Sequence, residues 1–327
     1  MMNSLAHAPS WPLGLVAALW LALLVDRWFG EPPLRWHPVV WMGRYLGWIG
    51  QHIAPLGAQA GQGADIRRFV LGALAWSLGA AVIGAAAITI QQWLLSWHAL
   101  VAVVLLGLLL KPLLAWRMLR DEVRAVEAAL QTSVESGRAQ LARLVSRDVS
   151  ALDEQQIRES AIESLAENLN DSLVAPLFWF VLLGLPGAAL YRYANTADAM
   201  WGYRGLREGR DWTWAGKWAA RADDVLSWLP ARLTALLLAL VQGGLSWRAL
   251  RAQAPRTPSP NSGWPMAAMA LALDVRLGKP GVYVLHEGGR APQPADSARA
   301  VQLGERAVLL CAALLAAVLL FVGENRA

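Results

Sequence analysis

Six long apolar runs constrain this chain more than any other feature of its sequence. They are Trp11–Trp28, Phe69–Leu95, Leu100–Trp116, Leu173–Tyr191, Val225–Trp247 and Ala307–Val322. About twenty apolar residues in a helix cross a hydrocarbon core of about 30 Å. Inside a bilayer, only helices and closed barrels satisfy every backbone polar group. The sequence therefore predicts an all-α, polytopic integral membrane protein with cytoplasmic helical and loop-rich segments.

The composition supports a membrane environment. Of the 327 residues, 56% are apolar and only 16% are charged, whereas about a quarter of an ordinary soluble domain is charged. Eighteen Trp against five Phe and five Tyr suit the interfacial belts where indole rings lie at headgroup level. Cys311 is the only cysteine, so no disulfide forms within the chain.

The charge balance narrows the classes of ligand. The 29 basic and 24 acidic residues give a net charge of +5, which suits anionic lipid or phosphorylated ligands. No basic run alternates with aromatic residues and no helix-turn-helix or zinc-finger spacing occurs, so we expect no nucleic-acid partner. The sequence also lacks a Walker phosphate loop, a Gly-x-Ser-x-Gly elbow and a paired-histidine zinc motif.

The runs divide the chain into five segments. We expect N-terminal spans over residues 1–116 with a cytoplasmic loop over 29–68, cytoplasmic helices over 117–172, broken or re-entrant helices over 173–247, a loop-rich cytoplasmic segment over 248–303 and a last span over 304–327. The first run ends in Asp26-Arg27-Trp28 without a small-residue cleavage site, so it is expected to stay as an anchor. The segment before it has no Lys or Arg, which predicts an external N-terminus.

Two of the six runs contain helix breakers. Leu173–Tyr191 contains two prolines and two glycines, and Val225–Trp247 contains Pro230 and Arg232. Irregular backbone at membrane depth is tolerated only where it is buried in protein or lines a cavity. We therefore predict that these two runs are broken or re-entrant and that the other four cross the membrane.

Outside the runs, one segment has the apolar spacing of an amphipathic helix, and two Pro- or Gly-rich stretches have no such spacing. Leu119, Val123, Val126 and Leu130 share one face of an amphipathic helix that is expected to end near Gly137. The proline-rich stretch 254–265 and the Gly/Pro-rich stretch 281–297 predict loops, with at most a short hairpin around Tyr283.

An acidic helix is the most informative stretch for chemistry. Ser150 with Asp153 resembles a capping box and predicts its start. Its apolar face comprises Ile157, Ala161, Ile162, Leu165 and Leu169, and its polar strip comprises Glu159, Glu163, Glu167 and Asn170, with Asp171 beside it. Like charges four residues apart repel, so a magnesium ion or an Arg from another segment could neutralise the strip, or it could be a solvated surface. Asn168 lies on the apolar face, where its amide needs a partner.

Three smaller groups carry both a structural and a functional interpretation. Asn195, Asp198, Ala199 and Gly202 share a helical face that suits either helix packing or a ligand. Arg221 and Asp224 are spaced to pair with each other, which leaves Asp223 and the intramembrane Arg232 as functional candidates. His37 follows the turn sequence Gly30–Pro33 and suits a capping or packing role.

Several strings together resemble the CobD/CbiB family, adenosylcobinamide-phosphate synthase. They are Asp26–Pro33, His37–Arg44, Glu163–Asp171 with Ala175–Trp179, Asn195–Arg204, Asp223–Thr234 and Pro260–Ala270, in order over residues 26–310. The resemblance implies an amide ligase that depends on ATP and magnesium. Such an enzyme joins (R)-1-amino-2-propanol or its O-phosphate to adenosylcobyric acid, a corrinoid, and gives adenosylcobinamide or its phosphate.

Our hypothesis assigns roles to particular residues, although the resemblance does not say which carboxylate has which role. Glu163, Glu167, Asp171, Asp198 and Asp223 are the expected catalytic carboxylates, and the first three are the expected magnesium ligands. Residues expected to hold phosphate or substrate are His37, Arg44, Asn168, Asn195, Arg204, Arg232 and Asn261.

Two other classes of function stay open at this point. A corrinoid transporter would also have intramembrane Arg and broken helices, although no inverted repeat is visible. A scaffold for other cobalamin-pathway enzymes could use the 117–135 helix as a docking surface. Under each interpretation we expect contact with membrane lipid in the bacterial cytoplasmic (inner) membrane, and a homo-oligomer is compatible with all of them.

Overall fold

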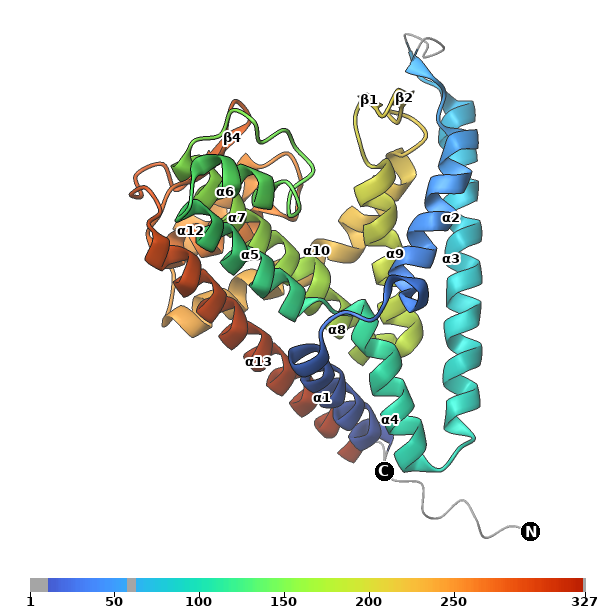
Figure 1. Ribbon diagram of the computed structural model, residues 1–327. Coiled ribbons are helices and arrows are strands. Elements are labelled where there is room, and N and C mark those ends of the chain that lie inside the picture. The colour runs from blue at the N-terminus through green and yellow to red at the C-terminus, as the bar shows by residue number, and fades with distance from the viewer. Residues whose placement is uncertain (1–10, 58–62, 326–327) are drawn as a thin grey trace, which may run out of the picture. The chain divides into compact units, whose positions relative to one another are not determined.

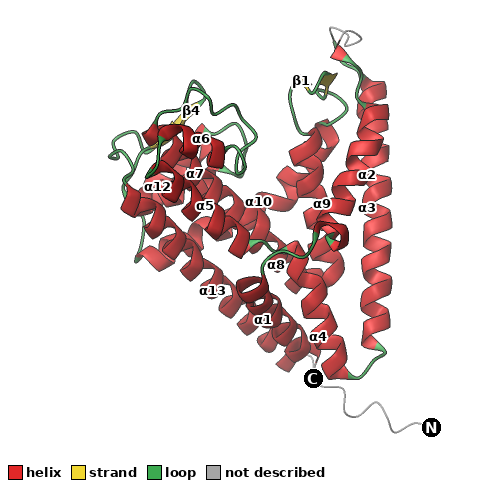
Figure 2. Cartoon of the chain, viewed as in Figure 1, coloured by secondary structure: helices red, strands yellow, loops and turns green. Residues whose placement is uncertain are grey.

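The computed structural model describes residues 11–57 and 63–325, and most of them are helical (Figure 2). The chain forms two compact units. The first comprises Met1–Leu114, Pro176–Leu226 and Leu315–Ala327, and the second comprises Ala115–Ala175 and Ser227–Leu314. Residues 1–10, on which the predicted orientation of the N-terminus depends, lie outside the described residues.

Long helices dominate the first unit, where α2, α3 and α9 lie side by side (Figure 1). Its elements are α1 (Trp11–Phe29), η1 (Leu34–Trp36), α2 (Pro38–Ile53), α3 (Ile66–Leu95), α4 (Ala99–Leu110), η3 (Lys111–Leu113), α8 (Ala175–Leu183, from Pro176 on), α9 (Leu185–Trp201), β1 (Leu206–Arg207) and β2 (Arg210–Asp211). The helices α10 (Lys217–Gln242) and α13 (Pro294–Glu324) contribute residues to both units.

Aromatic packing and close backbone approaches hold the first unit together. Trp201 and Trp212 stack in its core with ring centroids 6.0 Å apart. A Cβ atom on Gly72 of α3 would lie 1.9 Å from the carbonyl oxygen of Ala215. Only glycine allows that approach, so Gly72 fixes α3 against the segment that leads into α10.

The second unit is built around one central helix. Its elements are α5 (Trp116–Leu130), α6 (Val134–Leu141), α7 (Glu154–Leu169), the π-helical turn η4 (Asn170–Val174), α11 (Trp247–Gln253), η5 (Ala254–Arg256), α12 (Gly263–Leu273), β3 (Leu277–Lys279) and β4 (Tyr283–Leu285). The helices α5, α6 and α12 and the strand β3 all pack against α7. Residues on every side of α7 are therefore buried.

The amphipathic helix is confirmed, but its predicted end is wrong. Leu119, Val123, Val126 and Leu130 of α5 are all buried, as their spacing predicts. The helix ends at Leu130 and not near Gly137, because the Ser133 side chain accepts a hydrogen bond from the backbone N–H of Ser136 and starts α6. Gly137 lies inside α6.

The start of the acidic helix lies a few residues beyond the predicted one. Asp153, not Ser150, is the N-cap of α7. Its carboxylate accepts a hydrogen bond from the N–H of Gln156 at 2.8 Å, and the Gln156 side-chain oxygen accepts one from the N–H of Asp153 at 3.0 Å. The capping box is therefore Asp153 with Gln156.

Within residues 11–57 and 63–325, five helical segments are long and apolar enough to cross a membrane. They are Pro12–Phe29, Ile66–Leu95, Ala99–Leu130, Lys217–Gln242 and Pro294–Glu324. Four of them contain the four runs that the sequence predicts to cross. The fifth, α10, contains most of the Val225–Trp247 run.

One of the two predicted helix breaks is confirmed. The Leu173–Tyr191 run is interrupted at Gly184, where φ is +70° between α8 and α9. A Gln91 side-chain oxygen from α3 accepts a hydrogen bond from the N–H of Leu185 at 2.7 Å. This bond satisfies one of the free N–H groups at the start of α9.

The predicted break in Val225–Trp247 is wrong, because α10 continues through Pro230. Proline has no N–H, so the carbonyl of Leu226 loses its usual helical donor. The indole N–H of Trp179 donates to that carbonyl at 3.1 Å. A donor from another helix therefore replaces the missing one.

The segment 248–303 is less loop-rich than predicted. It contains α11 and α12, and α13 already begins at Pro294. The expected short hairpin is present as β3 and β4, in which Gly278 is paired with Val284. Asp274 in the left-handed conformation, with φ of 54°, ends α12 and lets the chain turn into β3.

Within the first unit, segments far apart in the sequence meet at two places. A Cβ atom on Gly323 of α13 would lie 2.6 Å from Pro12 of α1, so the end of α13 lies beside the start of α1. The β1–β2 hairpin is joined to the loop after α2, where the N–H of Gly57 donates to Gly209 and the N–H of Asp211 donates to Pro55, both at 2.9 Å.

Candidate functional site

The acidic side chains of α7 are buried, not solvated. Glu159 and Glu163 are 3% and 4% exposed. The interpretation of this strip as a solvated surface is therefore wrong for both residues. The reason is that α7 is surrounded by other elements of the second unit, which a helical period alone does not reveal.

Arginines from other segments neutralise the two buried glutamates. Arg147, in the loop before α7, lies 3.4 Å from the Glu163 carboxylate, and Arg276, just before β3, lies 3.4 Å from that of Glu159. Arg147 also hydrogen-bonds the hydroxyl of Ser160. An Arg from another segment was one of the predicted ways to relieve the like-charge repulsion on this helix.

Glu163 is the most unusual ionisable group of this cluster. Burial raises its pKa from 4.5 to about 7, although the neighbouring Arg147 and the Tyr283 hydroxyl of β4 both favour the ionised form. Its Oε1 atom is buried and has no hydrogen-bond partner among the described residues. A carboxyl group with a pKa near 7 can both give and accept a proton at neutral pH.

Tyr283 was not among the predicted site residues. Burial and the neighbouring Glu163 and Glu167 carboxylates raise the pKa of its phenol, which therefore stays protonated, and its hydroxyl donates to the sulfur of Met266 at 3.8 Å. The hairpin brings Tyr283 to Glu163 across 120 positions of sequence. No local pattern in the sequence signals this contact.

Asn168 and Asp171, two further residues of the predicted acidic site, form hydrogen bonds with residues close to them in the sequence. The Asn168 amide donates to the carbonyl oxygen of Ser164 at 3.0 Å, one turn back on its own helix, so it does not need a partner in the apolar face. Asp171 accepts a hydrogen bond from the Asn170 amide at 2.7 Å, and Asn170 in turn accepts one from the Thr234 hydroxyl at 3.1 Å.

The three carboxylates that the sequence suggests as magnesium ligands do not form one cluster. Among the described residues, no three Asp, Glu, His or Cys side chains lie close enough together to hold a metal ion. Glu163 is also buried beside Arg147, which competes with a cation for the carboxylate. Glu163, Glu167 and Asp171 therefore form no preorganised three-carboxylate centre.

Two of the predicted phosphate or substrate residues are brought together. The Arg232 guanidinium donates to the Asn261 side-chain oxygen at 2.7 Å and to the Pro260 carbonyl at 3.2 Å. It lies over the rings of Trp228 and Trp264, 4.5 and 4.9 Å from their centroids. This arrangement holds a half-buried positive charge in a fixed position in the second unit.

The other predicted residues belong to the first unit. His37 shares a hydrogen bond with Glu31 at 3.0 Å, and Asn195 accepts one from Arg192 at 3.4 Å. Asp198 lies against Gly202, where a Cβ atom would come within 2.0 Å of its carboxylate. Arg44 is exposed on α2 and Asp223 is half-buried on α10.

Arg204 interacts electrostatically with Asp224, which also interacts with Arg221 as the sequence predicts.

The five predicted catalytic carboxylates are divided between the two units. Asp198 and Asp223 lie in the first unit, and Glu163, Glu167 and Asp171 lie in the second. Convergence of all five carboxylates on one substrate stays a prediction.

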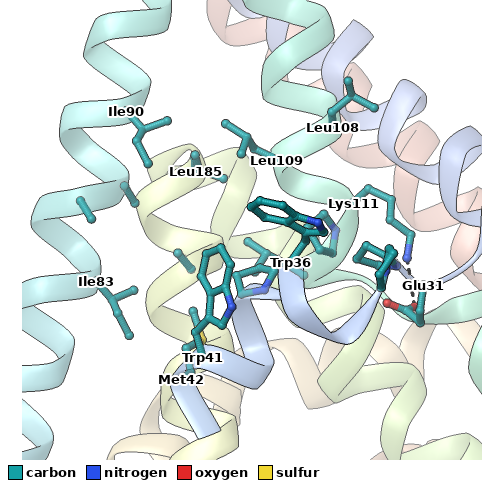
Figure 3. A pocket seen from close by; sticks show the side chains of 18 of the residues that line it. Glu31, Trp36, Trp41, Met42, Ile83, Ile90, Leu108, Leu109, Lys111 and Leu185 are labelled. Carbon is teal, nitrogen blue, oxygen red and sulfur yellow. Dashed lines mark ion pairs between the residues drawn. The ribbon is translucent and has the colours of Figure 1, made fainter. Parts of the chain in front are cut away.

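The first unit also contains a cavity that the sequence did not predict. Its volume is about 810 Å³, and its walls come mainly from α1, α2, α3 and α4 (Figure 3). At one end, Lys111 lies 3.0 Å from Glu31 and 3.4 Å from Asp26. A signal was present, because Lys111 is one of only three lysines and lies inside the apolar run Leu100–Trp116.

Comparison with known proteins identifies the family. The family model described as CobD/Cbib protein matches residues 19–309. A protein of Methanothermobacter thermautotrophicus named "Probable cobalamin biosynthesis protein CobD" is 41% identical over 277 residues, which cover 83% of this chain and 86% of that protein. "Cobalamin biosynthesis protein CobD" of Chromobacterium violaceum is 40% identical over 318 residues, which cover 94% and 97%.

A protein of the same name from Dehalococcoides mccartyi is 37% identical over 281 residues, which cover 84% of this chain and 87% of that protein. No solved structure matches the chain. The family model and these relatives cover both units of the fold, and the chain therefore belongs to the CobD/CbiB family of cobalamin biosynthesis proteins.

Proposed function

We propose that the protein is an ATP-dependent amide ligase of adenosylcobalamin biosynthesis in the bacterial cytoplasmic membrane. It would attach (R)-1-amino-2-propanol or its O-phosphate to a propionate carboxylate of adenosylcobyric acid. Membership of the CobD/CbiB family supports the pathway. The observation that carries the chemistry is the buried Glu163 carboxyl, which titrates near neutral pH between Arg147 and Tyr283.

The proposed reaction has two steps. The propionate carboxylate first attacks the γ-phosphorus of ATP, which forms an acyl phosphate and releases ADP. The amine nitrogen then attacks the acyl carbon, the C–O bond to phosphate breaks, and inorganic phosphate leaves. The nitrogen must lose a proton as the amide forms, and Glu163 in its ionised form is suited to accept it.

The other residues would bind charge and position substrate. The fixed guanidinium of Arg232, held by Asn261, suits a phosphate or a corrin amide oxygen. Arg204 is a second candidate donor for phosphate, and the carboxylates Asp198 and Asp223 are candidates for the ammonium of the amino alcohol. Because Glu163, Glu167 and Asp171 form no three-carboxylate cluster, we propose that magnesium arrives as the counter-ion of ATP.

The direct test is ligation by the purified protein in proteoliposomes. ATP consumption should require both adenosylcobyric acid and the amino alcohol, and mass spectrometry should detect the amide product. The free amino alcohol and its O-phosphate are compared side by side. Corrinoid uptake without ATP consumption would instead indicate a transporter, and neither uptake nor ligation would favour a scaffold.

Glu163→Gln tests the proposed base. It should lower kcat/KM by about 10²- to 10⁴-fold, the usual contribution of general base catalysis. It should also remove the rise in rate through about pH 7 that ionisation of Glu163 predicts. Glu135→Gln, at an exposed position of α6, is the matched control. An unchanged pH profile in the Glu163 variant would exclude this role.

A further inference from the structure

The 810 Å³ cavity of the first unit is apolar over almost its whole wall. The polar atoms of two aromatic side chains that line it are bonded elsewhere. The Trp41 indole N–H donates to the Arg35 carbonyl at 3.0 Å, and the Tyr45 hydroxyl donates to the Ala75 carbonyl at 2.8 Å. Their rings therefore contribute apolar surface, as Figure 3 shows for Trp41.

The cavity is lined by membrane-type helices. Helices α1, α3 and α4, which contribute to its wall, all belong to segments that are long and apolar enough to cross a membrane. Around it, Val82, Ile90 and Leu108 are exposed apolar side chains. A chain from the surrounding hydrocarbon could enter between them without leaving an apolar environment.

The polar end of the cavity offers a hydrogen-bond acceptor. Glu31 lines the cavity beside Lys111 (Figure 3), and its side chain is 23% exposed. Burial disfavours its charge, but the hydrogen bond to His37 and the charge of Lys111 outweigh burial and lower the pKa of Glu31. Glu31 is therefore ionised near neutral pH and can only accept hydrogen bonds.

The lysine at the polar end of the cavity is already paired with carboxylates. Lys111 is 5% exposed on its side chain and lies within 3.4 Å of two carboxylates, those of Asp26 and Glu31. An additional anion would meet two negative charges there, whereas an N–H donor would meet an accepting carboxylate. The charge pattern thus favours a headgroup with a primary ammonium.

We propose that this cavity binds an acyl chain of a membrane phospholipid whose ethanolamine ammonium donates hydrogen bonds to Glu31. The ligand is thus a phosphatidylethanolamine taken from the bilayer. The cavity volume lies in the range of ordinary ligand sites. The proposal does not depend on the ligase reaction, and its readout is lipid binding and not turnover.

Photolabelling in nanodiscs tests the binding. The probe is a phosphatidylethanolamine with a diazirine in one acyl chain. Unlabelled phosphatidylethanolamine should compete at least 10-fold better than phosphatidylcholine with the same chains, because the trimethylated ammonium has no N–H to donate. The crosslinks should map to the wall of the cavity on α3 and α4.

Two neighbouring alanines of α3 provide matched variants. Ala86 lines the cavity, and Ala85 is exposed outside it. Ala86→Trp should fill the space and reduce crosslinking at least 10-fold, and Ala85→Trp should leave it unchanged. Neither variant alters the ion cluster. Glu31→Gln should keep the label and lose the preference for phosphatidylethanolamine over phosphatidylcholine.

Two results would overturn the proposal. Equal competition by the two lipids, with crosslinking insensitive to Ala86→Trp, would indicate nonspecific lipid contact. Displacement of the probe by adenosylcobyric acid would identify the cavity as a corrinoid site instead. Because no ligation is measured, either result leaves the proposed ligase reaction to its own test.

Discussion

Glu163 places a titratable carboxyl group in the interior of the second unit, and this has a consequence for stability. Its pKa is raised by burial from 4.5 to about 7, so the folded state binds a proton more tightly than the unfolded state does. The neutral form thus stabilises the fold below about pH 4.5, and that contribution is lost as the pH rises through about 7.

We predict a stability difference of order 3 kcal/mol between these limits, from 1.36 kcal/mol for each pKa unit. Glu163→Gln, which cannot ionise, should lack this dependence, so its stability relative to the wild type should increase from pH 4.5 to pH 8. Thermal unfolding in detergent across this range measures the difference. Equal pH dependence in both proteins would contradict the assignment.

Lys111 is a buried cation that forms ion pairs with two carboxylates, those of Asp26 and Glu31. Lys111→Met should cost about 3–5 kcal/mol, since it leaves Asp26 and Glu31 without their shared cation. Addition of Asp26→Asn should recover part of that loss. Lys279→Met in β3 is the control and should be nearly neutral. Thermal unfolding in detergent compares the four proteins, and a loss below about 1 kcal/mol for Lys111→Met would be inconsistent with the ion pairs.

The individual residues of the site were only partly predictable from the sequence. Arg232 stood out because a charge inside an apolar run needs a partner, and its contact with Asn261 joins two predicted residues. The sequence did not indicate which residues pair with the buried Glu159 and Glu163. Arg147 and Arg276 lie in loops and meet α7 only through the tertiary fold, which a helical period cannot specify.

At the scale of elements, the break between α8 and α9 depends on one glycine. Gly184 has φ of +70°, and a Cβ atom there would lie 2.3 Å from the Gln91 side-chain oxygen that caps α9. Gly184→Ala should therefore cost about 1–3 kcal/mol in backbone strain, because φ of +70° with ψ of −155° is essentially restricted to glycine, and more through the displaced Gln91. Gly288→Ala, where no atom lies within 4 Å of the added Cβ, should be neutral. Equal thermal midpoints for the two variants would contradict this account.

The sequence predicts correctly those helices whose signals lie within the helix itself. The spacing of apolar residues predicts the buried face of α5, and the local composition predicts the membrane-type helices. The continuity of α10 was not predictable, because the Trp179 indole that replaces the donor missing at Pro230 comes from another helix. The helix α12 was hidden because Gly263 and Pro265 indicate a turn, although a proline in the first turn of a helix is tolerated.

At the scale of the whole molecule, the ends of the membrane-spanning part restrict the topology. The start of α1 and the end of α13 lie together, so the chain between them crosses the membrane an even number of times. Five segments of the described residues are long and apolar enough to cross, so an even number of crossings made by these segments leaves at least one that does not cross. In the second unit, α7, which precedes α10 in the sequence, packs against α12 and β3, which both follow it. Of the five segments, only α10 lies between α7 and α12 in the sequence, so we infer that α10 does not carry the chain across.

Cysteine labelling tests this topology. Cysteines at Glu135 in α6 and at Gly288 after β4 should react from the same side of the membrane. In the first unit, cysteines at Leu56 and Glu208 should also share one side, because their loops are hydrogen-bonded together. Cys311 is buried and should give little background. Labelling of either pair from opposite sides would be incompatible with the fold.

The π-helical turn at Asn170–Val174 has a consequence for how related sequences are aligned. A π turn closes its hydrogen bond over five residues, here from the N–H of Ala175 to the carbonyl of Asn170, and an α-helix uses four. It is equivalent to one inserted residue, and it offsets the side chains after it by about 100° from a regular helix. A homologue without this turn would carry a one-residue gap between Glu167 and Pro176, and a gapless alignment there would pair the wrong carboxylates.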